Sequence, residues 1–128
     1  MKFLAKYSDR AYALLRIAAG ILFAFHGAQK LFGVLGGHQA SLASQMGLAG
    51  LIELFGGLAI ALGFGTRIAA FLASGEMAVA YFQAHWKLQL TSHFFPIVNQ
   101  GELALLYCFL FLFVATRGTV TWGLDKKA

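Results

Sequence analysis

The sequence predicts an all-α integral membrane protein, folded as a bundle of four transmembrane helices. Hydrophobic residues make up 59% of its 128 residues and charged residues only 12%, and the mean hydropathy is +0.72. An average soluble domain carries about 25% charged residues. Each span needs about 20 apolar residues, so the chain has room for roughly four spans and short connections. We therefore expect one membrane domain over residues 1–128.

The first span is expected over residues 11–32. Ser8 and Asp9 precede it and suit an N-cap and the first helical turn. The basic residues before this run resemble the start of a signal peptide. However, Arg16 interrupts the apolar stretch, and no small-residue cleavage site follows cleanly. We interpret the segment as a span of the mature protein.

Turn-forming residues separate the other three spans. The second is expected over 46–64 and is closed by glycines, and the third over 67–86, behind a Thr66 cap. The fourth is expected over 99–117, after the only proline of the chain, Pro96.

The distribution of basic residues predicts the orientation. Cytoplasmic loops carry an excess of Lys and Arg. Most basic residues of this chain fall in the two termini and the connection between the second and third spans: Lys2, Lys6, Arg10, Arg67, Arg117, Lys126 and Lys127. Both termini are therefore expected to be cytoplasmic. The same basic residues account for the pI of 9.7, so we expect no nucleic-acid partner.

Ionisable residues within the spans point to a functional site. A charge at membrane depth costs a few kcal/mol, so such residues usually face a bundle interior and carry function. Five are found here: Arg16, Lys30, Glu53, Glu76 and Glu102. A rise of about 1.5 Å per residue puts all except Arg16 in the outer half or near the midplane. The sequence thus predicts a polar pocket in the outer half of the bundle.

Each of these residues also has a structural interpretation. Arg16 and Lys30 have side chains long enough to reach the membrane interfaces. Asn99 and Glu102 have the spacing of a helix capping box, and His85 beside Trp86 suits the membrane interface. The side chains of Glu53 and Glu76 are too short and lie too deep to reach a membrane interface, so they must be protonated, paired or hydrated.

Other sequence features narrow the chemistry. Cys108 is the only cysteine, which excludes an intrachain disulfide and a Cys-x-x-Cys redox pair. The sequence has no flavin or nicotinamide fingerprint. It also has no recognised metal-ligand spacing, so no metal is expected.

A set of short motifs, in order along the chain, resembles the DoxX family. They are Arg16, Gly20, Phe25-His26-Gly27-x-x-Lys30, Glu53-x-x-Gly56-Gly57, Gly63-x-x-Thr66-Arg67, Glu76-Met77 and Pro96-x-x-Asn99-x-Gly101-Glu102. The resemblance implies a multi-pass protein of the bacterial inner membrane with four helices. It also implies a link to thiosulfate:quinone oxidoreduction, or to an oxidoreductase complex serving oxidative-stress and thiol homeostasis or quinone stress. A self-contained thiosulfate enzyme would be expected to carry an extra soluble region, so we expect a subunit and not a stand-alone enzyme.

Together, the buried polar residues and the resemblance predict a membrane subunit of an oxidoreductase system that binds a quinone or similar lipophilic ligand. Glu53, Glu76 and Glu102 are the candidate proton-exchanging, catalytic residues. The candidate ligand-binding residues, of which the first three would donate hydrogen bonds, are His26, Lys30, Gln83, His85 and Asn99. A soluble or membrane redox partner would supply electrons. Membrane lipids and further copies of the chain are the other expected partners.

Three alternatives remain open at this stage. In the first, the charges are a structural network in a non-catalytic scaffold or assembly partner. In the second, His26 and His85 are axial ligands of a haem, which we consider the weakest. In the third, the chain is a small-molecule carrier, for which four spans are few unless it oligomerises.

Overall fold

The computed structural model describes residues 1–126 and is helical, with no β-strand among those residues. Lys127 and Ala128 lie outside the described residues. The helices in chain order are α1 (Lys2–Ala5), α2 (Ser8–Phe32), α3 (Gln45–Leu51), the π-helix η1 (Ile52–Gly56), α4 (Gly57–Leu62), α5 (Thr66–Ala80), the π-helix η2 (Tyr81–Trp86), the 3₁₀ helix η3 (Ser92–Phe94), α6 (Pro96–Asn99) and α7 (Glu102–Arg117).

The helical segments follow the apolar runs of the sequence closely. The run expected over 11–32 is α2, the run over 46–64 is the continuous segment α3–η1–α4, and the run over 67–86 is α5–η2. Two helices, Ser8–Phe32 and Gln45–Leu62, are long and apolar enough to cross a membrane. The helix expected over 99–117 starts later than predicted, because α6 ends at Asn99 and Gln100 adopts a left-handed φ of 60°. As a result α7 begins at Glu102.

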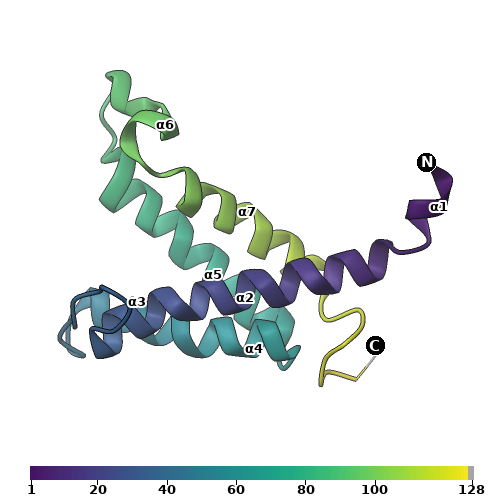
Figure 1. Ribbon diagram of the computed structural model, residues 1–128. Coiled ribbons are helices and arrows are strands. Elements are labelled where there is room, and N and C mark those ends of the chain that lie inside the picture. The colour runs from purple at the N-terminus through teal and green to yellow at the C-terminus, as the bar shows by residue number, and fades with distance from the viewer. Residues whose placement is uncertain (127–128) are drawn as a thin grey trace.

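Two helical hairpins make up the structure. In one, α2 packs along α3, η1 and α4, and in the other α5 packs along α7. Figure 1 shows the hairpins close together near α4 and diverging toward the ends that carry α3 and α6. The buried core lies between them and includes Phe23, Ile60, Phe111 and Val114.

Glycines bring α2 and α4 into close contact. A Cβ on Gly57 would lie 2.6 Å from the backbone nitrogen of Ala24 and from the carbonyl oxygen of Gly20. A Cβ on Gly27 would lie 2.2 Å from the backbone nitrogen of Leu54. Small residues permit such close approach of helix backbones, a common arrangement in membrane proteins.

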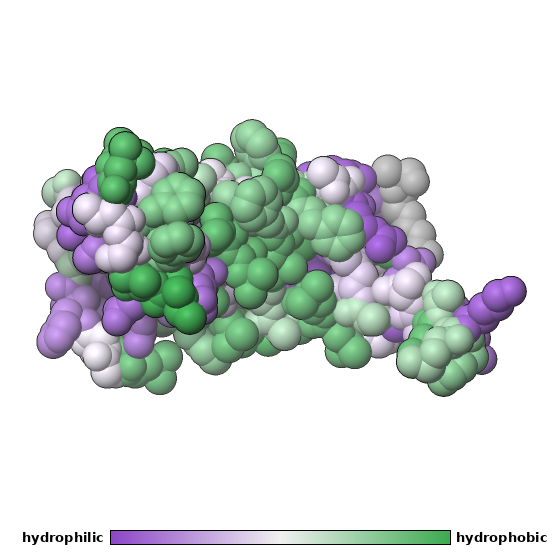
Figure 2. Space-filling model, turned by 90° about the horizontal axis from the view of Figure 1, so that it is seen from above, coloured by the Kyte–Doolittle hydropathy of each residue, from purple (hydrophilic) through white to green (hydrophobic). Residues whose placement is uncertain are grey.

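The surface of the molecule is strongly apolar. Large side chains such as Phe55, Phe71 and Phe109 are more than half exposed. Figure 2 shows apolar side chains across the middle of the visible face and hydrophilic side chains toward both ends. This distribution suits contact with lipid around the middle of the molecule, because a soluble monomer rarely exposes such large apolar patches.

Candidate functional site

A cavity of about 940 Å³ lies between the diverging hairpins. Its wall includes residues of α2, α3, η1, α5, η2 and α7, and most of these side chains are apolar. Ligand sites are typically concave and apolar, with a few placed polar groups. The cavity therefore has the general form of a site for a lipophilic molecule.

The central polar contact of the cavity is an ion pair between Lys30 and Glu53. Lys30 is in the last turn of α2, and Glu53 is in the π-helical turn η1. The Glu53 side chain is only 2% exposed, whereas that of Lys30 is 23% exposed. Burial of a carboxylate in an apolar wall is costly unless a cation compensates it, and Lys30 supplies that cation.

Glu76 of α5 is the third charged residue of the cavity wall. Its carboxyl group lines the same cavity as Glu53, where α5 packs against η1. The Oε2 atoms of both glutamates are buried and accept no hydrogen bond from the protein among residues 1–126. Lys30, Glu53 and Glu76 form what we call the charged triad. It joins one cation to two carboxyl groups across the two hairpins.

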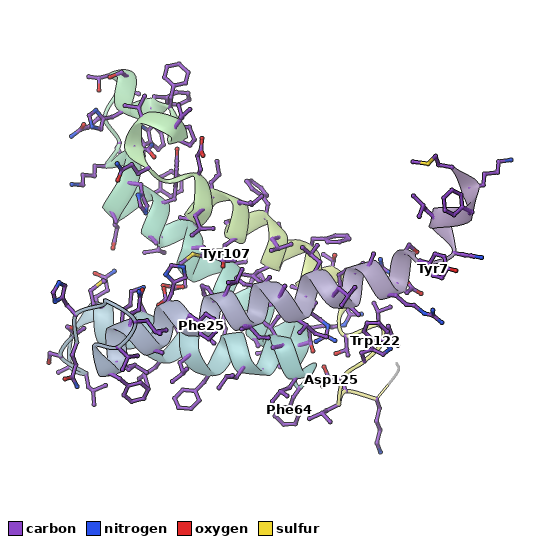
Figure 3. All side chains as sticks on the ribbon, in the orientation of Figure 1. Tyr7, Phe25, Phe64, Tyr107, Trp122 and Asp125 are labelled. Carbon is purple, nitrogen blue, oxygen red and sulfur yellow. The ribbon has the colours of Figure 1, made fainter. Side chains whose placement is uncertain are left out.

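His26 and Tyr107 form an aromatic part of the same wall. The ring of Tyr107 meets that of His26 edge-on, with 6.4 Å between centroids, and stacks on Phe111 at 5.2 Å. Tyr107 lies where the hairpins face each other (Figure 3). No sequence motif singles out Tyr107, because a tyrosine in an apolar helix looks like an ordinary core residue.

Gln83 and His85 are the predicted residues that η2 contributes to the wall. Gln83 is exposed and accepts a hydrogen bond of 2.6 Å from the side chain of Gln45 in α3, which links the two hairpins. His85 is half-buried, and its Nδ1 lies 3.2 Å from the backbone oxygen of Asn99. Both π-helical turns thus carry predicted site residues, and such turns are frequent at functional sites.

The remaining two predicted residues, Asn99 and Glu102, do not line the cavity. Asn99 is buried, donates to the backbone oxygen of His93 and accepts from the backbone N–H of Gly101, so it fixes the turn before α7. Glu102 is exposed in the first turn of α7, where the N-cap is Gly101. The capping-box interpretation of this pair is therefore wrong. Because α7 begins at Glu102, that residue is not at the third helical position that a capping box requires.

Arg16 is fully buried and does not extend to the surface. Its guanidinium group donates to the carbonyl oxygens of Ile60 and Ala61 at the end of α4, and to those of Thr121 and Trp122 in the C-terminal tail. Arg16 therefore satisfies the last carbonyls of one helix and holds the tail against it.

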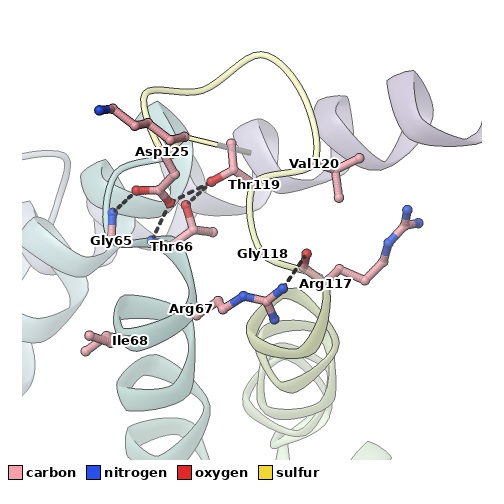
Figure 4. Close-up of a pocket in the computed structure, with 10 residues that line it drawn as sticks. Gly65, Thr66, Arg67, Ile68, Arg117, Gly118, Thr119, Val120 and Asp125 are labelled. Atoms are coloured by element: carbon pink, nitrogen blue, oxygen red, sulfur yellow. Dashed lines mark hydrogen bonds between the residues drawn. The ribbon is translucent and has the colours of Figure 1, made fainter. Parts of the chain in front are cut away.

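A second pocket, of about 650 Å³, lies where this tail meets the start of α5 (Figure 4). Asp125 accepts hydrogen bonds from the backbone N–H groups of Gly65 and Thr66 and from the hydroxyl of Thr119. These hydrogen bonds, that from the Thr66 backbone foremost, lower the pKa of Asp125 from its ordinary value. The sequence predicts a cap from Thr66 itself, and the structure shows no such side-chain cap. Instead the cap of α5 comes from the tail.

Comparisons with known proteins agree with the sequence motifs. The family model DoxX matches residues 11–86. A protein of Haemophilus influenzae described only as uncharacterized is 41% identical over 131 residues, covering 99% of this chain and 97% of that protein. No solved structure matches. Family membership and the apolar helices together indicate a membrane protein. This chain belongs to the DoxX family.

Proposed function

We propose that this protein is the membrane subunit of an oxidoreductase system and binds a quinone or similar lipophilic ligand in the cavity between its hairpins. The bacterial inner membrane is the proposed location, with four spans formed by α2, α3–η1–α4, α5–η2 and α7. The observation that carries the proposal is the charged triad in the wall of a largely apolar cavity.

The cavity suits a ligand with a polar head and an apolar tail. Leu48, Phe71 and Leu72 line it and are each more than half exposed. The cavity therefore continues to the apolar surface of the molecule, where an acyl or isoprenoid tail would meet lipid. The head group would lie at the triad, where the polar groups of the wall are concentrated.

The triad provides the means to exchange a proton. Two carboxyl groups in one buried wall disfavour each other's ionised form, so the pair favours holding one proton between them. With one proton on the Glu53–Glu76 pair, the pair carries a single negative charge that Lys30 balances. Gain or loss of that proton beside a bound quinone is the role we assign to the glutamates. The quinone supplies the redox chemistry when bound, and a partner protein supplies the electrons.

Ligand-induced stabilisation tests this function. A ligand that binds only the folded state stabilises it by an amount that grows with the logarithm of the ratio of ligand concentration to Kd, and so raises the melting temperature. Decylubiquinone should therefore stabilise the detergent-purified protein against heat. The Glu76→Gln variant should show a changed affinity, whereas Glu102→Gln, at an exposed position outside the cavity, should behave as wild type.

A non-catalytic scaffold is the second candidate, and the Lys30–Glu53 ion pair favours it because buried pairs also fix helix packing. In a scaffold, the triad variants would lower stability in proportion to the pairing lost. Decylubiquinone would then give no protection at any concentration, and that result would sink the quinone proposal.

The proposed topology has its own test. Reporter fusions after Leu35 and after Leu90 should read as external, because these positions fall in the first and third connections, between α2 and α3 and between η2 and α7. A fusion at the C-terminus should read as internal. The reverse pattern would place the cavity on the cytoplasmic side and overturn the orientation.

A further inference from the structure

The hydroxyl group of Tyr107 is a hydrogen-bond donor in the cavity wall, and the proposed function gives it no role. The ammonium of Lys30 is paired with Glu53, the side-chain amide of Gln45 donates to the side-chain oxygen of Gln83, and the ring of His85 is bonded to the backbone of Asn99. Among residues 1–126, the Tyr107 hydroxyl makes no hydrogen bond to the protein, although Tyr107 is only 5% exposed and lines the cavity.

A hydroxyl at a buried residue usually has a hydrogen-bond partner, which can be protein, water or a ligand. The Tyr107 oxygen is not enclosed by protein, however, and retains accessible surface toward the cavity. Whatever occupies the cavity is therefore the available partner for this hydroxyl. Within residues 1–126, the other lining donors without a protein partner are the ring of His26 and the side-chain amide nitrogens of Gln83 and Gln100, and these residues are less buried than Tyr107.

The ring that carries this hydroxyl is held in place on several sides. It stacks on Phe111 with the ring planes 4° apart, and Phe23 contacts it at 5.5 Å between centroids. Both phenylalanines are almost fully buried. A donor on such a support keeps its direction, which is what selective recognition of an acceptor requires.

We propose that Tyr107 is a specificity-determining residue, whose hydroxyl donates a hydrogen bond to a carbonyl oxygen on the head group of the bound ligand. The inference rests on the proposed function and refines it. It assigns the recognition of the carbonyl to Tyr107 of α7, whereas the ammonium of Lys30 is paired with Glu53. The ligand class that fits is a quinoid or other aromatic ketone, with its ring beside the edge of His26.

The test compares two probes on two variants. Decylubiquinone carries carbonyl acceptors, and decylbenzene has a similar tail with no acceptor. The Tyr107→Phe variant keeps the aromatic stack and removes only the hydroxyl. Its affinity for decylubiquinone should be about tenfold lower than that of wild type, because one hydrogen bond is lost. Its affinity for decylbenzene should equal that of wild type. The Tyr7→Phe variant, at an exposed tyrosine outside the cavity, serves as the matched control.

The outcomes separate this inference from the function on which it rests. Equal affinity of wild type and Tyr107→Phe for decylubiquinone would overturn the role of Tyr107 and leave the quinone proposal standing. Equal weakening of both probes would mean that the substitution disturbed the shape of the cavity, which also overturns the donor role. Binding of neither probe by wild type would overturn both proposals together.

Discussion

Lys30 near the end of α2 pairs with Glu53 in the π-helical turn of the neighbouring helical segment, and the Glu53 side chain is 2% exposed. The pair lies at the contact of α2 with η1 and faces the cavity between the hairpins. A charge buried to this degree depends on its partner for compensation.

Removal of Lys30 alone should therefore be strongly destabilising. The Lys30→Met variant leaves Glu53 buried without its cation, and we expect a loss of about 3 kcal/mol in the free energy of unfolding. The double variant Lys30→Met with Glu53→Gln removes both charges and should recover much of that loss. Denaturant unfolding in detergent measures all three proteins. A double variant as unstable as the single one would show that packing, and not charge, dominates at this contact.

Two adjacent glycines provide a direct test of helix packing. A Cβ on Gly57 would collide with the backbone of α2, whereas a Cβ on Gly56 would meet no atom within 4 Å. Gly57→Ala should therefore lower the melting temperature markedly. Gly56→Ala should leave it unchanged or raise it, because alanine favours helix by up to about 1 kcal/mol. Thermal unfolding of the two variants side by side gives the answer. Similar melting temperatures for both would contradict the close approach of α2 and α4.

Much of the helical framework could be predicted, because long apolar runs and their glycine boundaries are local signals. The helix rise alone also predicts that His26, Lys30, Glu53 and Glu76 lie in one layer of the bundle, in its outer half or near its midplane. All four line the cavity. Their roles stay predictions.

Features that depend on tertiary contacts could not be predicted. Nothing local distinguishes Tyr107 from a core tyrosine. The C-terminal tail has no periodic pattern, yet residues 119–125 bond to the chain between α4 and α5. The predicted last span begins at residue 99, three residues before the observed start of α7 at Glu102. This difference explains why the sequence places Asn99 and Glu102 in the pocket.

The hydrogen bonds of Arg16 predict that replacing it with lysine will lower the stability of the protein. Its guanidinium reaches four carbonyl oxygens in two separate segments, which a single ammonium group does not match. Arg16→Lys should cost about 2 kcal/mol of stability, because charge-assisted hydrogen bonds are lost in a buried site. Arg10→Lys, at an exposed position of the same helix, is the control and should be neutral. An Arg16→Lys variant with wild-type stability would show that charge alone suffices there.

Asp125 should make stability depend on pH in the acidic range. Its pKa is lowered in the folded state by the N–H groups of Thr66 and Gly65 and the hydroxyl of Thr119, whereas the unfolded chain has the ordinary aspartate value of about 3.9. The unfolded state therefore binds the proton more readily. The contribution of Asp125 is fully present above about pH 5 and is lost as the pH falls through the unfolded and then the folded pKa.

The Asp125→Ala variant isolates this contribution. At pH 7 it should be less stable than wild type by about 1 kcal/mol, the usual effect of losing a helix cap. The difference should stay constant down to about pH 5 and shrink below about pH 4, as the unfolded wild-type chain takes up its proton. Melting temperatures of both proteins between pH 3 and pH 7 provide the measurement. A difference that is the same at pH 3 and pH 7 would mean that the carboxylate charge of Asp125 takes no part in capping α5.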